Sequence, residues 1–212
     1  MKSIRLTPRL VASVVCFLAP VFLATGFGAQ SLGESPVAEH KSGSLTHAVA
    51  LDLSGQSVAP FARADAKAVV FVFISVECPI SNRYAPEIKR LDDEFAKSGV
   101  RLWLVYPDPD TTVDAIKQHQ KDYQLPDRVL RDPHHALVRF ARVRVTPETA
   151  VFLPDGRLVY RGRIDNRYLA LGSERPEATQ HELREVLEAV IQGKSSPYTS
   201  APAVGCYIAD AK

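Results

Sequence analysis

The chain has 212 residues, of which 46% are hydrophobic and 24% are charged. This composition is typical of one globular domain with a substantial core. The formal net charge is only +2, so the chain lacks the large basic field that nucleic-acid binding requires. It also has neither an internal repeat nor a G-x-x-x-x-G-K-[ST] loop, which excludes repeat proteins and P-loop NTPases.

The N-terminus has the order of a secretory signal. Three basic residues, at positions 2, 5 and 9, precede an apolar run over residues 10–27. We predict a signal peptide over residues 1–29. The alternative is a retained membrane anchor, because the run is close to the minimum length of a membrane-spanning helix. Pro20 and the weakly apolar residues of the run favour cleavage. The protein is therefore expected in the periplasm or another extracytoplasmic compartment, where cysteines can pair.

The following residues lead into the domain. Residues 30–45 are rich in Ser, Gly, Glu and Lys and show no period, which predicts a flexible linker. We expect the domain over residues 46–193, beginning with a short strand at 48–53 and an irregular segment at 56–66. Residues 67–75 are apolar almost throughout. Because strands covered on both faces have this pattern, we predict a central strand here, with helices on both sides of the sheet.

Helices and strands alternate after this strand. Tyr84, Ile88, Leu91 and Phe95 have the spacing of one helix face, and Gly99 is placed to end that helix. The elements expected next are a strand at 100–106, a helix capped by Thr111 or Thr112 that runs to Gln124, a short extended segment at 129–131 and a helix at 133–141.

The last part of the domain is predicted to be a hairpin and a helix. A strand at 145–153 is entered through Pro147, and a tight turn leads into a second strand at 158–162. The final helix is expected at 177–192, and a flexible tail over residues 194–212 follows it. This order of elements predicts an α/β fold, a three-layer α/β/α sandwich with a mixed central sheet.

Cys78 stands where the predicted central strand meets the first predicted helix. The unpaired N–H groups of a helix N-terminus stabilise a thiolate and so lower the thiol pKa. Glu77 opposes this effect, because a neighbouring carboxylate disfavours a second negative charge. A buried structural cysteine is the alternative, but the strand–helix junction favours a redox nucleophile.

These features together resemble the thioredoxin fold, and more narrowly the exported thioredoxin-like redoxins of the AhpC/TSA type. The resemblance rests on the order of elements, Cys78 at its junction, the Thr146-Pro147 step before a strand and the Asp155-Gly156 turn after it. It implies an oxidoreductase with antioxidant activity, a redox-active cysteine and no cofactor. It also implies that Pro147 is a cis-proline facing the active site, with Thr146 before it.

The motif Cys78-Pro79-Ile80-Ser81 departs from the C-x-x-C pattern of thioredoxins, because Ser81 takes the place of the second cysteine. Fast release of a mixed disulfide is therefore not available within this motif. We predict a thiol–disulfide oxidoreductase with Cys78 as the catalytic nucleophile. The residues expected to act with it are Cys206, which resolves the mixed disulfide, and Pro79, Ser81, Thr146 and Pro147, which support the active site.

Two other functions stay open. Pro79 directly after Cys78, and the hydroxyl of Ser75 three positions before it, match peroxiredoxins. That similarity implies a thiol peroxidase, whose arginine would be Arg142 or Arg144. The second alternative is a non-catalytic binding module of the redoxin fold, in which Cys78 forms a structural disulfide with the tail.

The tail and the histidines bear on these choices. About a dozen flexible residues can span tens of ångströms, so Cys206 can reach Cys78. His134 and His135 are adjacent and point in different directions, which favours surface histidines over a metal site.

The expected partners are a disulfide-containing or thiol protein, or a small hydroperoxide. We expect no nucleic acid, and a membrane only if the N-terminal segment is retained.

Overall fold

The computed structural model of the protein describes residues 49–62 and 65–209. The chain divides into two compact units, residues 1–38 and 39–212, and the described residues all belong to the second. The predicted signal peptide and the predicted linker therefore lie outside the described residues. Within those residues, none of the helices has the length and the apolar character needed to cross a membrane.

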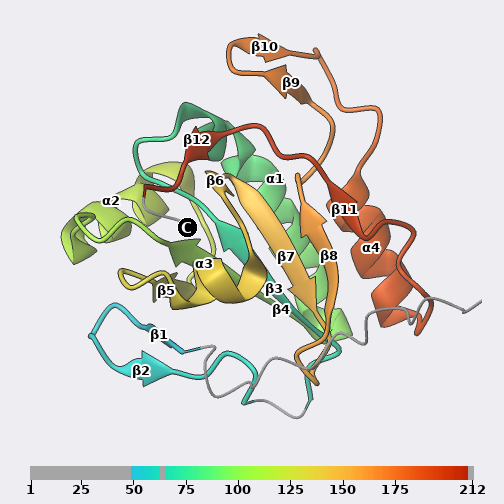
Figure 1. Ribbon diagram of the computed structural model, residues 1–212, viewed down its shortest axis with the longest axis horizontal. Coiled ribbons are helices and arrows are strands. Elements are labelled where there is room, and N and C mark those ends of the chain that lie inside the picture. The colour runs from blue at the N-terminus through green and yellow to red at the C-terminus, as the bar shows by residue number, and fades with distance from the viewer. Residues whose placement is uncertain (1–48, 63–64, 210–212) are drawn as a thin grey trace, which may run out of the picture. The chain divides into compact units, whose positions relative to one another are not determined.

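An eight-stranded mixed sheet runs through the domain (Figure 1). Its strands, in spatial order, are β11 (Ser200–Ala201), β8 (Leu158–Gly162), β7 (Glu148–Phe152), β3 (Ala68–Phe73), β4 (Val100–Tyr106), β5 (Val129–Arg131), β1 (Ala50–Leu51) and β2 (Ser57–Val58). β3 pairs in parallel with β4 and antiparallel with β7. β3 is therefore a central strand of a mixed sheet, as predicted.

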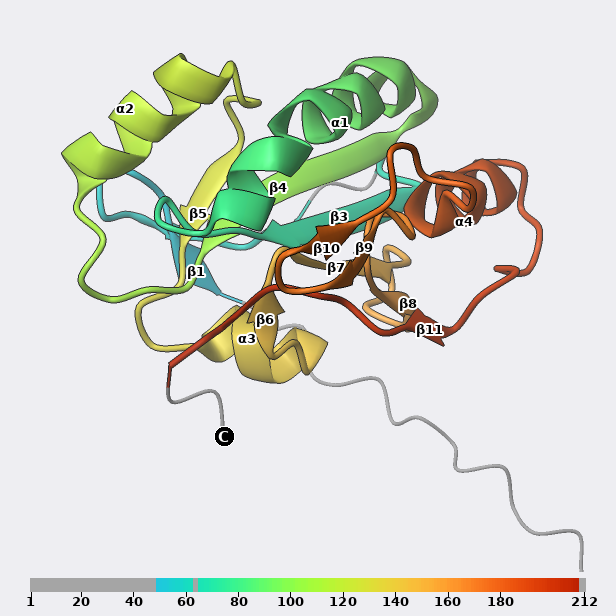
Figure 2. The same cartoon turned by 90° about the horizontal axis from the view of Figure 1, so that it is seen from above.

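Helices cover both faces of this sheet. Figure 2 shows α1 (Pro79–Phe95), α2 (Val113–Tyr123) and α4 (Glu182–Ile191) on one face and α3 (Ala136–Ala141) on the other. A 3-10 turn, η2 (Ala96–Ser98), follows α1, and Gly99 ends it in the left-handed region, as its position in the sequence predicts. The arrangement is the predicted three-layer α/β/α sandwich.

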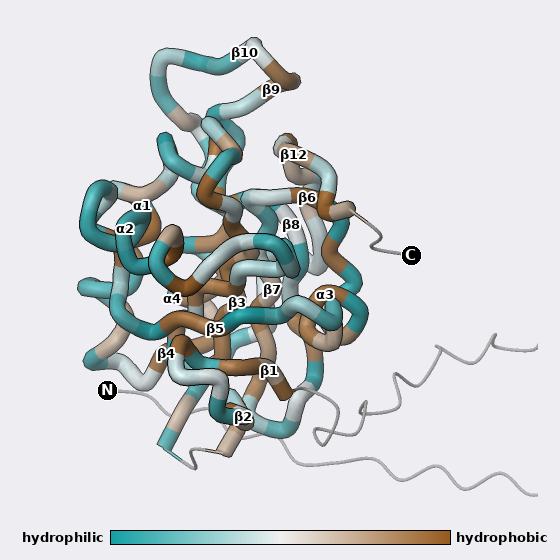
Figure 3. The backbone as a smooth tube through the Cα atoms, turned by 90° about the vertical axis from the view of Figure 1, so that its left-hand side faces the viewer, coloured by the Kyte–Doolittle hydropathy of each residue, from teal (hydrophilic) through white to brown (hydrophobic). Residues whose placement is uncertain are grey.

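The side chains of β3 pack in two hydrophobic cores, one on each face of the sheet. Val70 and Val72 pack with α1, α2 and α4 in the first core, whereas Phe71 and Phe73 pack with α3 in the second. All six residues of β3 are buried. Figure 3 shows this distribution as hydrophobic colour along the central strands and hydrophilic colour over much of the outer helices. The apolar run that predicted a doubly covered strand is thus explained by alternation between two cores.

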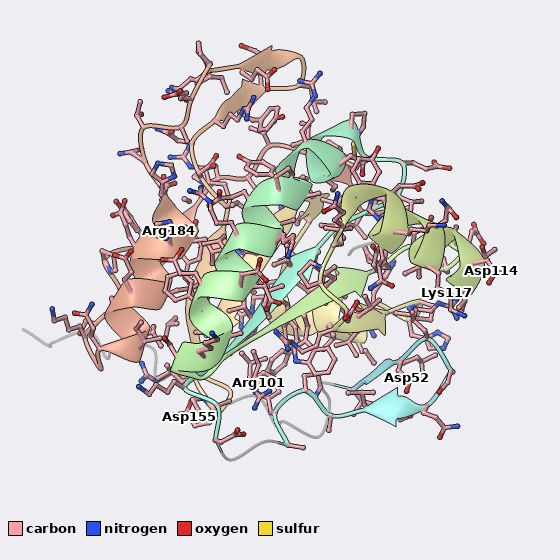
Figure 4. All side chains as sticks on the ribbon, turned by 180° about the vertical axis from the view of Figure 1, so that it is seen from behind. Asp52, Arg101, Asp114, Lys117, Asp155 and Arg184 are labelled. Atoms are coloured by element: carbon pink, nitrogen blue, oxygen red, sulfur yellow. The ribbon has the colours of Figure 1, made fainter. Side chains whose placement is uncertain are left out.

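Polar side chains join the outer elements (Figure 4). Arg184 of α4 donates to the carboxylate of Glu94 on α1 at 2.6 Å. Its guanidinium also lies 5.8 Å from the centre of the Phe95 ring. In the turn between β1 and β2, the Asp52 carboxylate accepts from the N–H groups of Ser54 and Gln56 at 2.8 and 2.9 Å.

Two helices begin later than predicted, and at each a polar side chain accepts backbone N–H groups at or just before the first turn. The carboxylate of Asp132 accepts N–H bonds from Ala136 and Val138 at 2.7 and 2.9 Å, so α3 begins at Ala136. The amide oxygen of Asn166 accepts from Thr179 and Gln180 at 2.8 and 3.1 Å, so the expected helix at 177–192 begins only after this bend. α2 follows its prediction, with Thr112 as its cap.

Several short strands have no counterpart in the predictions. Among them, β9 (Tyr168–Ala170) pairs with β10 (Ser173–Glu174), and β12 (Cys206–Tyr207) pairs with β6 (Val145–Thr146), which is the first part of a predicted strand. The expected strand at 145–153 is divided at Pro147, so that β6 leaves the main sheet while β7 stays in it. Strands of two or three residues are too short to show a period, which is why the sequence did not reveal them.

The tail lies against the domain over its described length. β11 pairs in parallel with β8 at the edge of the main sheet, and β12 then pairs with β6. Just before β11, the hydroxyl of Tyr198 donates to Glu185 of α4 at 2.9 Å. The expectation of a loose tail is therefore not what the structure shows for residues 194–209.

Candidate active site

Cys78 lies between the end of β3 and the first turn of α1, where only 1% of it is exposed. Its N–H donates to the carbonyl of Ser75 at 3.3 Å, and its carbonyl accepts from Asn82 at 3.1 Å. Pro79 occupies the first helical position, where its missing N–H costs no hydrogen bond. The strand end and the helix start together fix the direction of the thiol.

The Thr146–Pro147 peptide bond lies against this thiol. It is a cis bond, as the resemblance to thioredoxins implied. The Cys78 thiol donates a hydrogen bond to the Thr146 carbonyl, with 3.0 Å between sulfur and oxygen. Thr146 is itself buried, with 3% exposed. The structure therefore brings Cys78, Thr146 and Pro147 together.

The tail adds Cys206 to the same place. β12 runs antiparallel to β6, with Cys206 opposite Thr146 and Tyr207 opposite Val145 (Figure 1). The N–H of Ile208 donates to the Arg144 carbonyl at 3.0 Å and extends this pairing. Both cysteines are free thiols in this structure, Cys78 buried and Cys206 partly exposed. Residues far apart in the sequence thus form one dithiol site.

The two thiols have opposite acidities. Burial acts on Cys78 to raise its pKa, but hydrogen bonds from the Cys206 thiol and from Ser81 outweigh it, so the Cys78 pKa is lowered. Burial, the hydrogen bond to Cys78 and the charge of Cys78 raise the pKa of Cys206 to about 11. Of the two thiols, Cys78 is therefore the more acidic, and the Cys206 thiol is a hydrogen-bond donor to the Cys78 thiolate when it forms. Glu77 is exposed, and the opposing effect expected from it does not prevent the lowering.

Ser81 is a positioned donor for this thiolate. It is buried in the first turn of α1, and both its backbone N–H and its hydroxyl lower the pKa of Cys78. The hydroxyl oxygen also accepts from the N–H of Ser75 at 3.4 Å, which orients the hydroxyl hydrogen away from that contact. The residue in the place of a second motif cysteine thus stabilises the charge on the first.

Replacing Ser81 with alanine is expected to raise the pKa of Cys78. Loss of a hydrogen bond to a charged group, about 1.5 kcal/mol, corresponds to roughly a tenfold slower alkylation on the acidic limb of the pH profile. The measurement is the rate of iodoacetamide alkylation against pH, in a Cys206→Ser background. Ser98→Ala, at the far end of η2 from Cys78, is the control. An unchanged profile in Ser81→Ala would show that the hydroxyl does not contact the thiolate.

A buried polar chain supports the loop that carries Cys78. The Tyr106 hydroxyl lies 2.8 Å from His119 Nδ1, and His119 Nε2 lies 2.8 Å from Asn82 Oδ1. The amide nitrogen of Asn82 donates to the Val76 carbonyl at 3.3 Å. Asn82 thus accepts from Nε2–H, and His119 is a neutral imidazole whose Nδ1 accepts from Tyr106. No sequence pattern pointed to His119, because its two hydrogen-bond partners come from two other elements, β4 and α1.

Acidification is expected to destabilise the folded protein at His119. Burial lowers the pKa of His119 below its ordinary value, so the unfolded state binds the proton more tightly than the folded state. Stability contributed by neutral His119 is therefore present above about pH 6.5 and is lost as the pH falls, with a slope below ~1.4 kcal/mol per pH unit. Urea unfolding of wild type and His119→Gln between about pH 7 and pH 5 tests this. Parallel curves for the two proteins would contradict it.

The paired histidines and the two arginines were the other candidate residues. His135 is buried and its Nε2 lies 3.0 Å from the Pro107 carbonyl, whereas His134 is exposed. The expectation of two surface histidines is therefore wrong for His135. Among residues 49–62 and 65–209, no cluster of metal-ligating side chains is present. Arg142 and Arg144 are exposed, and no hydrogen bond described in these ranges joins either guanidinium to Cys78.

Comparison with solved structures supports the fold. A hypothetical protein of Sinorhizobium meliloti 1021 matches with a TM-score of 0.63 and 24% identity, covering 76% of this chain and 88% of that one. An uncharacterized conserved protein of Geobacillus kaustophilus matches with a TM-score of 0.63 and 23% identity, covering 76% and 86%. At these identities the likeness concerns the fold alone.

A secreted disulfide oxidoreductase of Mycobacterium tuberculosis, homologous to DsbE of E. coli, is more distant in structure. Its TM-score is 0.45 at 16% identity, with 68% of this chain and 94% of that one covered. None of the curated proteins has a sequence that matches this one significantly. The family comparison is decisive, because the match to the family described as Redoxin extends over residues 41–178, most of the described domain. The protein belongs to the Redoxin family and has a thioredoxin-like fold.

Proposed function

We propose that this protein is an exported thiol–disulfide oxidoreductase in which Cys78 is the nucleophile and Cys206 resolves the mixed disulfide. The observation that carries the proposal is the placement of Cys206 opposite Thr146, whose carbonyl is already bonded to the Cys78 thiol. A thiol and a thiolate held together in this way form the two halves of a redox-active pair.

The reaction begins at the thiolate of Cys78. It attacks one sulfur of a substrate disulfide R–S–S–R′, and the S–S bond breaks to release R′–S⁻. Cys78 then carries the R–S group as a mixed disulfide. The Ser81 donors favour this thiolate at pH values where an ordinary cysteine is protonated.

The acidity of Cys206 then sets the order of events. Before attack, the hydrogen bond to Cys78 and the charge of Cys78 both help to keep Cys206 protonated. Both causes disappear once Cys78 is a neutral mixed disulfide, so the Cys206 pKa falls. The Cys206 thiolate attacks Cys78 Sγ, R–S⁻ leaves, and a Cys78–Cys206 disulfide remains. The substrate gains two electrons, which the two protein thiols supply.

Export is part of this proposal. It is supported by the basic residues and the apolar run of the N-terminal sequence, which have the order of a signal peptide. An extracytoplasmic compartment also permits disulfides to persist. The substrates proposed there are disulfides or thiols, and the reaction needs no cofactor.

Thiol trapping in graded redox buffers tests the proposed pair. Mass spectrometry of the alkylated protein should show a Cys78–Cys206 disulfide that forms and opens reversibly in the folded protein. The same spectra report where the N-terminus is cleaved. Two results would reject the proposal: cysteines that never pair, or a disulfide that opens only on unfolding. The second result would instead support a structural bridge in a binding module.

A further inference from the structure

The outer edge of β6 is occupied by the protein's own tail. An edge strand beside a nucleophilic thiol offers free N–H and C=O groups to which an extended polypeptide can add. Here the tail has that position, because β12 pairs with both residues of β6. The hydroxyl of Thr146 also lies 3.5 Å from the Cys206 carbonyl. An incoming polypeptide would therefore compete with a strand that is already in place.

Two glycines allow the tail to approach so closely. A Cβ atom at Gly205 would lie 2.1 Å from the Thr146 oxygen and 2.6 Å from the Thr146 carbonyl carbon. A Cβ atom at Gly162 would lie 2.0 Å from the oxygen of Ala201 in β11. Arg163 donates its N–H to the same Ala201 oxygen at 3.2 Å. Because backbone contacts hold the tail at both strands, its place beside Cys78 depends on residues without side chains.

A small cleft opens beside Cys206. Its volume is about 250 Å³, and Pro107, His135, Thr146, Cys206, Tyr207 and Ile208 are among the residues that line it. Cys78 is not among the lining residues and is only 1% exposed. A molecule in the cleft therefore contacts Cys206 and does not contact Cys78.

The chemistry of a Cys78–Cys206 disulfide also favours attack at the sulfur of Cys206. In thiol–disulfide exchange, the sulfur that leaves faster is the one with the lower thiol pKa. Attack on Cys206 expels Cys78, whose thiolate the backbone N–H and the hydroxyl of Ser81 stabilise, whereas attack on Cys78 would expel Cys206, whose pKa burial raises. Access from the cleft and the leaving-group ability of Cys78 thus both favour attack at Cys206.

We propose that the cleft beside Cys206 admits a small-molecule thiol that reduces the Cys78–Cys206 disulfide by attack at Cys206, while β12 excludes extended polypeptides from the edge of β6. The thiolate R–S⁻ bonds to Cys206 Sγ, the Cys78–Cys206 bond breaks, and Cys78 leaves as the thiolate. A second R–S⁻ attacks the R sulfur and releases R–S–S–R and the Cys206 thiolate, which takes a proton. Two small thiols are oxidised and the protein disulfide gains two electrons.

The first test uses the oxidised wild-type protein and two probes, 2-mercaptoethanol and an extended peptide with one cysteine. After acid quenching and alkylation, peptide mapping should find the 2-mercaptoethanol adduct on Cys206 and the alkyl group on Cys78. Per thiolate, 2-mercaptoethanol should react at least about tenfold faster than the peptide. An adduct mainly on Cys78, or equal rates for the two probes, would overturn the proposal.

The second test displaces the tail from β6. It also separates this inference from the proposed function on which it rests. In a Cys206→Ser background, Gly205→Val should speed the reaction of Cys78 with a peptide disulfide at least about tenfold, with a smaller effect on hydroxyethyl disulfide. Pro202→Ala, at an exposed position of the tail, is the control. If Cys78 reacts equally with both disulfides in the Cys206→Ser protein that keeps Gly205, only the inference fails. If Cys78 reacts with neither, the proposed function fails.

Discussion

Disulfide reduction by the Cys78→Ser variant is expected to fall to the uncatalysed background. Serine is close to cysteine in size, but its hydroxyl is not ionised at neutral pH and does not exchange with disulfides. Removal of a nucleophile lowers catalysis by roughly three orders of magnitude or more. The measurement is the rate of reduction of hydroxyethyl disulfide, a small substrate that does not need the edge of β6, at fixed protein and reductant concentrations.

Folding must be shown to be intact in this variant, because Cys78 is buried and its thiol donates to Thr146. Serine retains a donor at this position, so the urea midpoint should change little. A folded Cys78→Ser variant with wild-type activity would mean that Cys78 is not the nucleophile. Reactivity toward hydrogen peroxide alone, with no disulfide reduction by wild type, would instead identify a thiol peroxidase.

The Cys206→Ser variant is expected to stop after the first step. Cys78 still attacks the substrate, but no second thiol lies beside it to release the product. The effective concentration of an oriented neighbouring group far exceeds that of millimolar thiol in solution. Turnover should therefore fall by about 100-fold or more. A mixed disulfide between Cys78 and the substrate should accumulate, and it can be detected as a mass increase under non-reducing conditions.

Pro202→Ala is the control for this variant. Pro202 is an exposed residue of the same tail and does not line the cleft beside Cys206, so its replacement leaves both thiols in place. Its turnover should stay near that of wild type. If Cys206→Ser turns over normally and forms no lasting mixed disulfide, then the resolving thiol comes from solution or from a partner.

Much of the fold could be predicted from the sequence because the relevant signals are local. The apolar run of β3 is long enough to show burial on both faces, and the spacing of Tyr84, Ile88, Leu91 and Phe95 matches the buried face of α1. β4 has the predicted bounds because Gly99 marks its start and Pro107 follows its end. Cys78 was identifiable for the same reason, since a strand–helix junction is a local feature of the chain.

The predictions were weakest where a side chain acts on distant backbone. Asn166 binds the N–H groups before α4, and Asp132 binds those at the start of α3; these contacts move helix starts that periodicity alone placed too early. His119 was missed because its hydrogen bonds connect α2 to β4 and α1. A pattern along the sequence contains no information on such partners.

The sequence by itself determined the order of layers, the position of Cys78 and the loss of a second motif cysteine to Ser81. It did not determine the place of Cys206, because a tail long enough to reach Cys78 can also lie elsewhere. Tertiary structure decided this through the pairing of β12 with β6, which only a glycine at position 205 permits at so short a distance. The acidities of the two thiols follow from that contact, because each depends on burial and on the hydrogen bond to the other.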